Sequence, residues 1–314
     1  MVRLLEELER DTGTGVLPFA HGHKLEVNHL KKILWPKAGI TKGELLRYYA
    51  HVSPWLLPVL KDRPLVMKRY PNGITGKAFY QQRAPEEVPA GVRVETLPED
   101  DEVPARLIGG ELITLLYMAQ LAVISQDPWF SRVGSTQIMD YVALDLDPMP
   151  GVPFDQVVQA ALHCRDVLEK LDIPHGLKTS GASGLHVYLP MPPKTTYESG
   201  RLFCEMIATL AAQRVPKLAT LTRTVDQRGR TVYIDYLQNL HGKTLASVYS
   251  VRASEFAGVS TPVTWAELEQ GARPQDFTIR TVLSGLLGRG DRWLSFRQNA
   301  GVDLHRILDQ LHQR

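Results

Sequence analysis

The chain has 314 residues, of which 44% are hydrophobic, which is enough for one large domain or two modest ones and argues against a disordered chain. No apolar run approaches the roughly 20 residues that span a bilayer, and the charged N-terminus is unlike a signal peptide. Cys164 and Cys204 lack metal-ligand spacing, so we expect buried free thiols in a reducing cytoplasm.

The net charge is only +2, but it is unevenly distributed along the chain. Residues 24–83 contain twelve Lys or Arg and three acids, whereas residues 84–102 contain seven acids and one Arg. Residues 213–252 are basic again, with seven Lys or Arg and two acids. Basic stretches on either side of an acidic one fit a protein that binds a polyanion, although ordinary solvated surface charge explains them equally well.

The first half of the chain mixes short elements. A capping box from Thr41 to Glu44 predicts the start of a helix that continues through Tyr49. In chain order we further expect a strand over 64–70, a turn over 71–73, a loop or short strands over 84–104 and a helix over 111–124.

The second half of the chain alternates strands and helices in an order that indicates a fold. We expect a strand over 141–147, a helix from Phe154 that ends before Pro174, strands over 175–180 and 185–189, a helix over 198–213 and a strand over 231–237. This is the split βαβ, ferredoxin-like order, in which the first strand lies between the third and the fourth and both helices cover one face. A strand over 245–251 and helices over 278–287 and 302–313 are expected to follow.

The sequence therefore predicts an α+β fold in a single domain, residues 1–314. Residues 136–314 are expected to form a catalytic module with a ferredoxin-like or RRM-like sheet and C-terminal helices. Residues 1–135 are expected to form an N-terminal α/β module that packs on it and binds DNA.

Three acids are the main candidates for catalysis. Strand alternation places Asp145 and Asp147 on the open face of the first strand and Asp235 on the open face of the fourth. Carboxylates that crowd together repel one another unless a cation lies among them, and hard oxygen ligands favour Mg²⁺ or Mn²⁺. Two such ions can activate a hydroxyl and neutralise a leaving pyrophosphate. The competing interpretation is a turn after Asp147 and a surface acid at Asp235.

The turn from Ser180 to Gly184 is a candidate phosphate site. Its glycines, Gly181 among them, permit close backbone approach, and the hydroxyls of Ser180 and Ser183 can bind phosphate oxygens. His186, Lys243 and Arg252 are further candidates for the same triphosphate. A flexible hairpin with a hydrogen-bonded strand histidine and two surface cations is the alternative.

In the first half, Lys68 lies close in sequence to Phe79 and Tyr80, and cations beside aromatic side chains can bind phosphates and stack on a base. Core packing is the alternative for Phe79. Lys32 and Lys42 flank Trp35, where a solvated basic face is equally consistent with the sequence.

Several short stretches together resemble one family, the polymerase domain of bacterial ligase D in the archaeo-eukaryotic primase superfamily. They are KILWP at 32–36, GITK at 39–42, RYPNG at 69–73, FY at 79–80, DLDP at 145–148, TSG at 179–181, GLHVY at 184–188, DYL at 235–237 and YSVR at 249–252. The resemblance covers nearly the whole chain, and the set of motifs is far more specific than two spaced aspartates.

The resemblance implies a template-directed DNA/RNA polymerase that fills gaps or ends in double-strand-break repair by non-homologous end joining. It implies a preference for ribonucleotides, two divalent ions (Mn²⁺ or Mg²⁺) on the three acids, and a nucleoid-associated, cytoplasmic protein. Gapped DNA with a 5′-phosphate, NTPs or dNTPs, a Ku-like protein and a DNA ligase are the implied partners. The resemblance implies that the 5′-phosphate is bound by Lys32, Lys42 and the nearby His29, and that the incoming nucleotide is positioned by Lys68 and Tyr80. The implied contacts to its triphosphate or sugar are Ser180, His186, Lys243 and Arg252. Arg228 is the implied contact to the templating end.

Two departures from that family's pattern bear on activity. Asp127 stands where the family usually has a histidine before Pro-Trp, and Ser183 stands where a lysine is common in the turn. Asp127 removes one implied phosphate or sugar contact and adds negative charge near the nucleotide, so this change bears on sugar preference and activity. Ser183 lowers the number of cations around the triphosphate, so we expect weaker nucleotide binding or a stronger dependence on metal.

Two other classes of protein remain open. A nucleotide cyclase also carries two acids on a ferredoxin-like sheet, and an RNA-binding module could use Tyr141 and Tyr188 as stacking platforms. Within the polymerase interpretation, the sequence leaves open whether the role is end joining, gap filling or priming, and whether the chain stands alone or is one domain of a longer protein.

Overall fold

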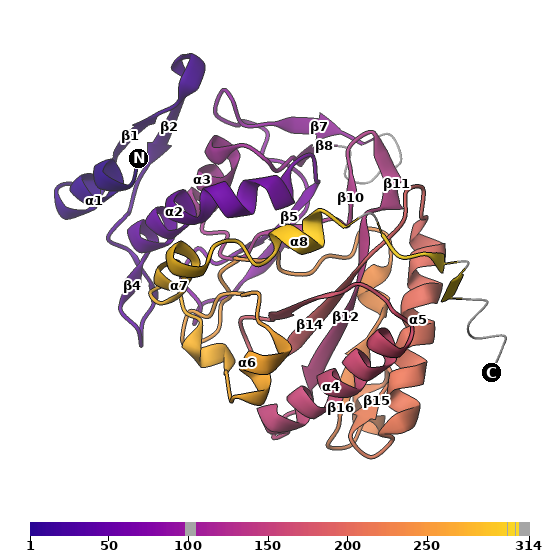
Figure 1. Cartoon of the computed structure of the whole chain (residues 1–314). Helices are drawn as coiled ribbons and strands as arrows, with labels where there is room; N and C mark the ends of the chain where they lie inside the picture. The colour runs from indigo at the N-terminus through magenta and orange to yellow at the C-terminus, as the bar shows by residue number, and fades with distance from the viewer. Residues whose placement is uncertain (98–104, 300, 305, 308–314) are drawn as a thin grey trace. The chain divides into compact units, whose positions relative to one another are not determined.

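The computed structural model describes residues 1–97, 105–299, 301–304, 306 and 307. The chain divides into two compact units. Figure 1 labels the helices and strands of both units. Unit 1 comprises Met1–Thr136, Leu245–Ser260 and Phe277–Gly290, and unit 2 comprises Gln137–Thr244, Thr261–Asp276 and Asp291–Arg314. Residues 245–260 and 277–290, which the sequence assigned to the second module, thus fold with the first.

Unit 1 is built on one long helix and several small sheets. Helix α2 (Lys42–Leu60) begins at the predicted capping box, in which Thr41 accepts from the Glu44 backbone N–H and the Glu44 side chain accepts from that of Thr41. The other elements of unit 1 are α1 (Val2–Arg10), β1 (Gly15–Pro18), β2 (Lys24–Val27), β3 (Ile33–Trp35), β4 (Ile40–Thr41), β5 (Leu65–Arg69), β6 (Phe79–Gln81), β7 (Val94–Thr96), β8 (Ala105–Leu107), α3 (Leu112–Gln120), β9 (Asp127–Pro128), β10 (Ser131–Arg132) and α7 (Val282–Arg289).

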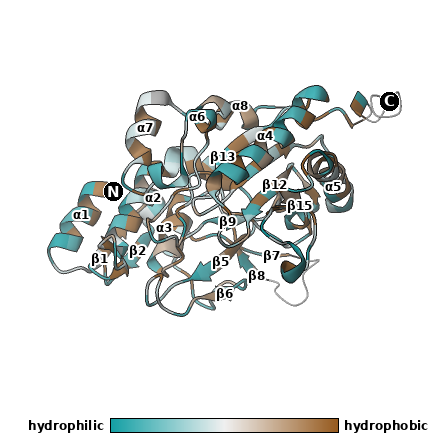
Figure 2. Ribbon diagram, turned by 90° about the horizontal axis from the view of Figure 1, so that it is seen from below, coloured by the Kyte–Doolittle hydropathy of each residue, from teal (hydrophilic) through white to brown (hydrophobic). Residues whose placement is uncertain are grey.

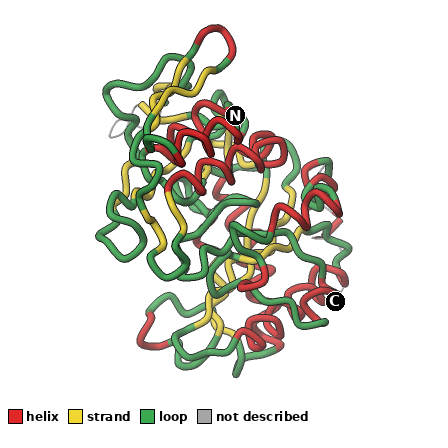
Figure 3. The backbone as a smooth tube through the Cα atoms, turned by 90° about the vertical axis from the view of Figure 1, so that its left-hand side faces the viewer, coloured by secondary structure: helices red, strands yellow, loops and turns green. Residues whose placement is uncertain are grey.

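The small sheets of unit 1 are mostly hairpins. Strands β1 and β2 pair antiparallel, and a short 3-10 turn, Ala20–Gly22, lies at the tip of their hairpin (Figure 3). Strand β5, predicted over 64–70, lies between β6 and β9 in a three-stranded sheet. Strands β7 and β8 fall in or beside the predicted loop over 84–104, of which 98–104 lie outside the described residues.

Three predicted elements of unit 1 differ from those observed. The helix predicted over 111–124 ends at Gln120, because Ala122 takes a left-handed φ of 60°. The strand predicted over 245–251 is wrong: Tyr249 has a φ of 63°, which interrupts extended backbone and leaves only an isolated bridge at Val251. The helix predicted over 278–287 begins later, at Val282, because residues 278–281 close a turn.

Unit 2 contains a five-stranded sheet in the order β13-β14-β12-β16-β15. The strands are β12 (Tyr141–Pro148), β13 (Gly176–Thr179), β14 (Leu185–Pro190), β15 (Ala219–Thr220) and β16 (Val232–Asp235); β11 (Ser135–Met139) precedes them where the chain passes from unit 1 to unit 2. Strand β12 pairs antiparallel with β14 on one side and with β16 on the other. The predicted split βαβ arrangement is therefore confirmed, and β15 is an addition at the edge that pairs parallel to β16.

Two amphipathic helices cover one face of this sheet. Helices α4 (Phe154–Lys170) and α5 (Tyr197–Arg214) each carry apolar and polar residues along their length (Figure 2), and both pack on β12. Short helices α6 (Trp265–Glu269) and α8 (Leu294–Arg297) follow, and the helix predicted over 302–313 lies largely outside the described residues. Within the described part of the chain, no helix is both long and apolar enough to cross a membrane.

The other face of the sheet is partly covered by the C-terminal segment. The rings of Trp293 and Phe296 lie 5.4 Å and 6.1 Å from the ring of Tyr188, and Phe296 lies 6.4 Å from that of Tyr141. Tyr141 and Tyr188 are consequently only 8% and 4% exposed. They do not form an open stacking platform, so the feature that favoured an RNA-binding module is absent.

Candidate functional site

Four polar side chains form one row across four strands of the unit 2 sheet. In the strand register, Lys178 on β13 lies opposite His186 on β14, His186 opposite Asp145 on β12, and Asp145 opposite Asp235 on β16. The distances are 2.7 Å from Lys178 Nζ to His186 Nδ1 and 3.3 Å from His186 Nε2 to Asp145 Oδ1. The predicted convergence of Asp145 and Asp235 on neighbouring strands is thus present.

Asp235 is held firmly by its neighbours. Its Oδ1 accepts from the Leu237 backbone N–H at 2.8 Å and lies 3.3 Å from the Tyr233 hydroxyl, and its Oδ2 accepts from Gln238 Nε2 at 3.1 Å. Burial raises the pKa of Asp235, the charge of Asp145 raises it further, and the hydrogen bond from Leu237 opposes the shift. A nearby cation would stabilise the ionised form of Asp235, because it would offset the negative charges of Asp235 and Asp145.

Asp147 lies two residues after Asp145 on the same strand, opposite Tyr233, and its side chain is exposed. Alternation places it on the same face as Asp145. Within the described residues, no three acidic, His or Cys side chains are gathered closely enough to enclose a metal ion as they stand. The donor set is nevertheless an open group of carboxylate oxygens, which suits Mg²⁺ or Mn²⁺ better than zinc.

The predicted phosphate turn closes partly on itself. Ser180 Oγ accepts from the backbone N–H groups of Ala182 at 3.1 Å and Gly184 at 3.0 Å. These two N–H groups are therefore engaged within the turn, while Gly181 supplies a left-handed φ of 75° and Ser183 is exposed. A phosphate at this turn would meet the Ser183 side chain first.

Position 184 requires glycine because its backbone lies close to β12, the strand that carries Asp145 and Asp147. A Cβ at this position would lie 2.3 Å from the backbone oxygen of Leu146, the residue between Asp145 and Asp147. Only glycine permits this approach. The turn is therefore held beside the two aspartates by backbone packing.

Two basic residues predicted to act in unit 2 are placed differently from one another. Lys243 is exposed in a loop after the 3-10 turn Leu237–Asn239. Arg228 is anchored: its Nε and Nη2 donate to the carbonyls of Thr222 and Arg223 at 2.9 Å, and its guanidinium lies 3.6 Å from the centre of the Tyr233 ring. Tyr233, whose hydroxyl contacts Asp235, is a site residue that the sequence analysis missed.

Unit 1 carries the predicted aromatic residues. Tyr80 is 67% exposed, and Lys68 Nζ lies 5.1 Å from the centre of its ring across the β5–β6 pair. Phe79 is also exposed and is covered by the guanidinium of Arg69 at 5.4 Å. Exposed rings with cations against them can stack a base and bind phosphate, so core packing does not account for Phe79.

His29, Lys32 and Lys42 also come together in unit 1. The backbone N–H of Lys42 donates to the carbonyl of Lys32 at 2.8 Å, and that of Lys32 donates to the carbonyl of His29 at 2.9 Å. Lys42 is 5% exposed, and its Nζ donates to the carbonyl of Gln120 at 3.0 Å. These residues form a compact basic cluster, which we call the unit 1 basic cluster.

Lys42 is expected to make the binding of an anion by this cluster depend on pH. Burial, followed by the charge of Lys32, lowers the pKa of Lys42 to about 8. Below that pH the free protein already carries the proton. Above it, binding a phosphate requires proton uptake, so affinity is expected to fall by up to about tenfold per pH unit.

Fluorescence titration of a 5′-phosphorylated duplex at a series of pH values measures this dependence. Lys42→Met should remove the decline above pH 8 that is expected of the wild-type chain, and Lys31→Met, at the neighbouring position outside the predicted site, should keep it. A wild-type affinity that is constant through this range would contradict the assignment.

The two remaining predicted positions also lie in unit 1. Asp127, on β9, accepts a hydrogen bond from Ser125 at 2.6 Å and is partly buried. It lies opposite Val66 on β5, the strand that also carries Lys68. Arg252 is partly buried, and its backbone N–H donates to the carbonyl of Gly258 at 2.8 Å.

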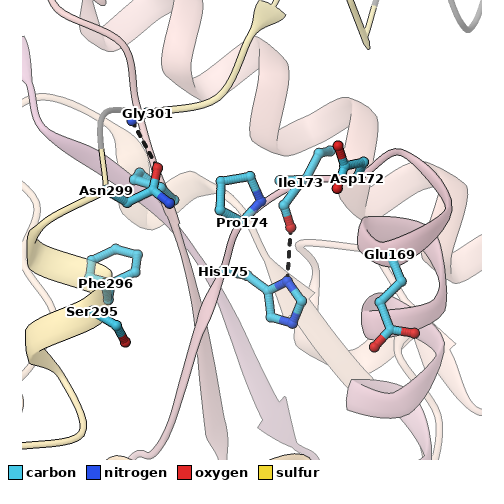
Figure 4. Close-up of a pocket in the computed structure, with 10 residues that line it drawn as sticks. Glu169, Asp172, Ile173, Pro174, His175, Ser295, Phe296, Asn299 and Gly301 are labelled. Atoms are coloured by element: carbon cyan, nitrogen blue, oxygen red, sulfur yellow. Dashed lines mark hydrogen bonds between the residues drawn. The ribbon is translucent and has the colours of Figure 1, made fainter.

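A pocket of about 680 Å³ in unit 2 contains none of the predicted site residues (Figure 4). His175 Nδ1 lies 2.9 Å from the Ile173 carbonyl, and Trp265 Nε1 donates to His175 Nε2 at 2.9 Å, so both ring nitrogens are engaged. The residues that line the pocket are Glu169, Asp172, Ile173, Pro174, His175, Pro190, Ser295, Phe296, Asn299 and Gly301. The candidate chemistry therefore lies elsewhere, on the row of side chains across the sheet.

Comparison with known proteins identifies the family of this chain. Residues 41–293 match the LigD, primase-polymerase domain family. The bifunctional non-homologous end joining protein LigD of Bacillus subtilis is 33% identical over 294 residues, which are 93% of this chain and 47% of that protein. The multifunctional non-homologous end joining protein LigD of Mycolicibacterium smegmatis is 28% identical over 78% of this chain and 32% of its own length.

A solved structure shows the same fold. The polymerase domain of Mycobacterium tuberculosis ligase D, in complex with DNA, has a TM-score of 0.79 and 28% sequence identity to this chain, and the match covers 86% of this chain and 96% of that domain. The family match and the fold thus define a nucleotidyltransferase of the primase-polymerase class. The chain belongs to the family of LigD primase-polymerase domains. It spans about a third to a half of the two LigD proteins that it resembles.

Proposed function

We propose that this chain is a template-directed polymerase that adds nucleotides at gaps or ends of broken DNA during non-homologous end joining. The observation that carries the proposal is the pairing of Asp145 with Asp235 across neighbouring strands, with Asp147 beside them on the same face. Polymerases place two divalent ions on such carboxylates to activate the attacking hydroxyl and to stabilise the leaving group. The family membership and the names of the relatives support the role in end joining.

Asp145, Asp147 and Asp235 would hold Mn²⁺ or Mg²⁺, which supply charge stabilisation when bound. The residues of the chain then have three tasks. Asp235 is oriented by Leu237 and Gln238, so its two oxygens keep fixed directions. Ser180, Gly181 and Ser183 would border the triphosphate, together with Lys243 and Arg252. His186, for which the sequence predicted the same role, is only 2% exposed and has its two ring nitrogens against Lys178 and Asp145. Lys68, Phe79 and Tyr80 would bind the incoming nucleotide, with Tyr80 stacking on the base.

The unit 1 basic cluster supports DNA as the partner. His29, Lys32 and Lys42 would bind the 5′-phosphate at the far side of a gap, where charge-assisted hydrogen bonds favour a dianion. Arg228 would contact the templating end. Because phosphate contacts release counterions, binding should weaken as salt rises. A Ku-like protein and a DNA ligase are the further partners that end joining requires.

Primer extension tests the proposal. The substrate is a short gapped duplex with a downstream 5′-phosphate, supplied with UTP or dTTP and with Mn²⁺ or Mg²⁺. We expect templated addition that prefers the ribonucleotide. Conversion of free NTP to a cyclic product without DNA would instead indicate a cyclase, and failure of addition under every condition would contradict the proposal.

Asp127 is expected to limit nucleotide binding, because its carboxylate brings negative charge to a position where the family usually carries a histidine. Asp127→His should lower the KM for NTP several-fold, since removal of one like charge near a phosphate is worth about 1 kcal/mol in partly solvated surroundings. Asp127→Asn removes the charge without adding an imidazole, so comparison of the two variants shows which of the two changes lowers the KM. Unchanged KM values for UTP and dTTP in both variants would exclude Asp127 from the nucleotide site.

A further inference from the structure

A lysine to which the sequence assigned no role lies fully buried on β13, at one end of the row that contains Asp145 and Asp235. Lys178 is 0% exposed, and besides its contact with His186 its Nζ lies 5.3 Å from the centre of the Tyr188 ring. A buried ammonium is costly, and an apolar side chain of similar volume often stabilises a fold at least as well. Lys178 is therefore better explained by an effect on the acids than by a contribution to stability.

The contacts of His186 indicate which ring nitrogen carries the proton. Asp145 Oδ1 lies 3.3 Å from Nε2, and an ionised carboxylate can only accept, so Nε2 carries the hydrogen. In a neutral imidazole Nδ1 then presents a lone pair toward Lys178 Nζ, at 2.7 Å. The lysine donates an N–H to that lone pair, so the hydrogen bonds from Lys178 to His186 and from His186 to Asp145 run in one direction.

The surroundings of the imidazole hold this arrangement in place. His186 is only 2% exposed, so water competes little for either nitrogen. The antiparallel register fixes the separations along the row, because Lys178, His186 and Asp145 are direct cross-strand partners. The ring of Tyr188, two residues along β14, lies over the lysine from the same face.

We propose that Lys178 is a positioning residue: it holds His186 as the Nε2–H tautomer, and the imidazole in turn fixes the orientation of the Asp145 carboxylate. The inference deepens the proposed function and rests on it. Groups that orient a ligating side chain commonly change metal affinity or activity by 10-fold to 100-fold when removed, in order of magnitude.

The first test uses the wild-type chain without metal, DNA or nucleotide. Long-range ¹H–¹⁵N correlation spectra at mildly alkaline pH, with the ring of His186 assigned by comparison with His186→Gln, report which nitrogen is protonated. We expect a protonated Nε2 and an unprotonated Nδ1. A protonated Nδ1, in the other neutral tautomer or in an imidazolium, overturns the proposal whether or not any variant folds.

The second test compares Lys178→Met with Leu177→Met, which places the same side chain one position earlier on the same strand. Mn²⁺ binding is measured by calorimetry on the protein alone, and kcat and KM for NTP are measured on gapped DNA. We expect Lys178→Met to weaken Mn²⁺ binding on the order of 10-fold to 100-fold, and Leu177→Met to leave it within about twofold, as a volume-conserving change does. Unchanged Mn²⁺ affinity in a folded Lys178→Met protein overturns the proposal.

A double-mutant cycle with His186→Gln identifies the route of the effect. If Lys178 acts through His186, Lys178→Met has no further effect on Mn²⁺ affinity in the His186→Gln background. Independent, multiplicative effects would overturn the proposal. The spectra require no catalysis, so loss of the predicted tautomer and loss of polymerase activity are separate results.

Discussion

Replacement of Asp145 by asparagine is expected to reduce templated nucleotide addition by roughly 10³-fold or more. A metal-binding carboxylate contributes to several kcal/mol of charge stabilisation in the transition state, and each ~1.4 kcal/mol corresponds to a factor of ten in rate. Asparagine keeps the shape of the side chain and a carbonyl oxygen while removing the charge. Because Asp145 lies directly opposite Asp235, the change leaves one partly buried carboxylate where two carboxylates faced one another.

The same variant should bind DNA nearly as well as the wild-type chain, and it should raise the stability of the metal-free protein, because one of two mutually repelling charges is gone. Single-turnover extension, fluorescence binding and thermal unfolding measure the three quantities. Asp166→Asn, on helix α4, makes the same chemical change at a surface ion pair with Arg165 and should leave all three close to wild type. Extension by Asp145→Asn at more than about a tenth of the wild-type rate would refute the assignment of Asp145 to the metals.

Loss of both lysines of the unit 1 basic cluster is expected to abolish discrimination between gaps with and without a 5′-phosphate. Lys32→Met with Lys42→Met removes two charge-assisted contacts, each worth about 1.5–3 kcal/mol, so affinity for the phosphorylated gap should fall on the order of 10²-fold or more. Affinity for the unphosphorylated gap should change far less. Methionine keeps much of the apolar stem of Lys42, which is buried against Gln120.

Competition between phosphorylated and unphosphorylated gapped duplexes at constant salt measures this discrimination. Lys24→Met with Lys61→Met, also in unit 1, removes the same total charge outside the cluster and should weaken both duplexes equally. If the wild-type chain binds the two duplexes equally well, the cluster is no 5′-phosphate site. A loss of discrimination in the control pair as well would indicate that overall charge, rather than the cluster, recognises the phosphate.

Features other than the paired acids distinguish the proposed polymerase from its alternatives. An RNA-binding module needs accessible rings on the sheet, and Trp293 and Phe296 cover Tyr141 and Tyr188. A nucleotide cyclase acts on a free nucleotide and does not require a site for the 5′-phosphate of DNA. The unit 1 basic cluster and the family membership therefore both favour a DNA substrate.

Local patterns in the sequence determined the fold of the catalytic sheet. Alternation over 141–147 fixes which side chains share a face of a strand, and the order of strands and helices limits the topology to the split βαβ arrangement that the structure confirms. The capping box at Thr41 likewise predicted the start of α2, because a cap depends on residues within one turn of helix. The acids could be placed together because their positions follow from strand periodicity and topology alone.

Only the tertiary structure decided what surrounds those acids. Lys178 reaches His186 through the register of two strands, which is set by the turn between them and by packing, and a one-residue slip would turn Lys178 to the other face. The contact between the rings of Trp293 and Tyr188 cannot be predicted from the sequence, because apolar packing has no direction and the two residues lie far apart along the chain. The burial that lowers the pKa of Lys42 is likewise a property of the folded chain, because desolvation depends on every element packed around the amine.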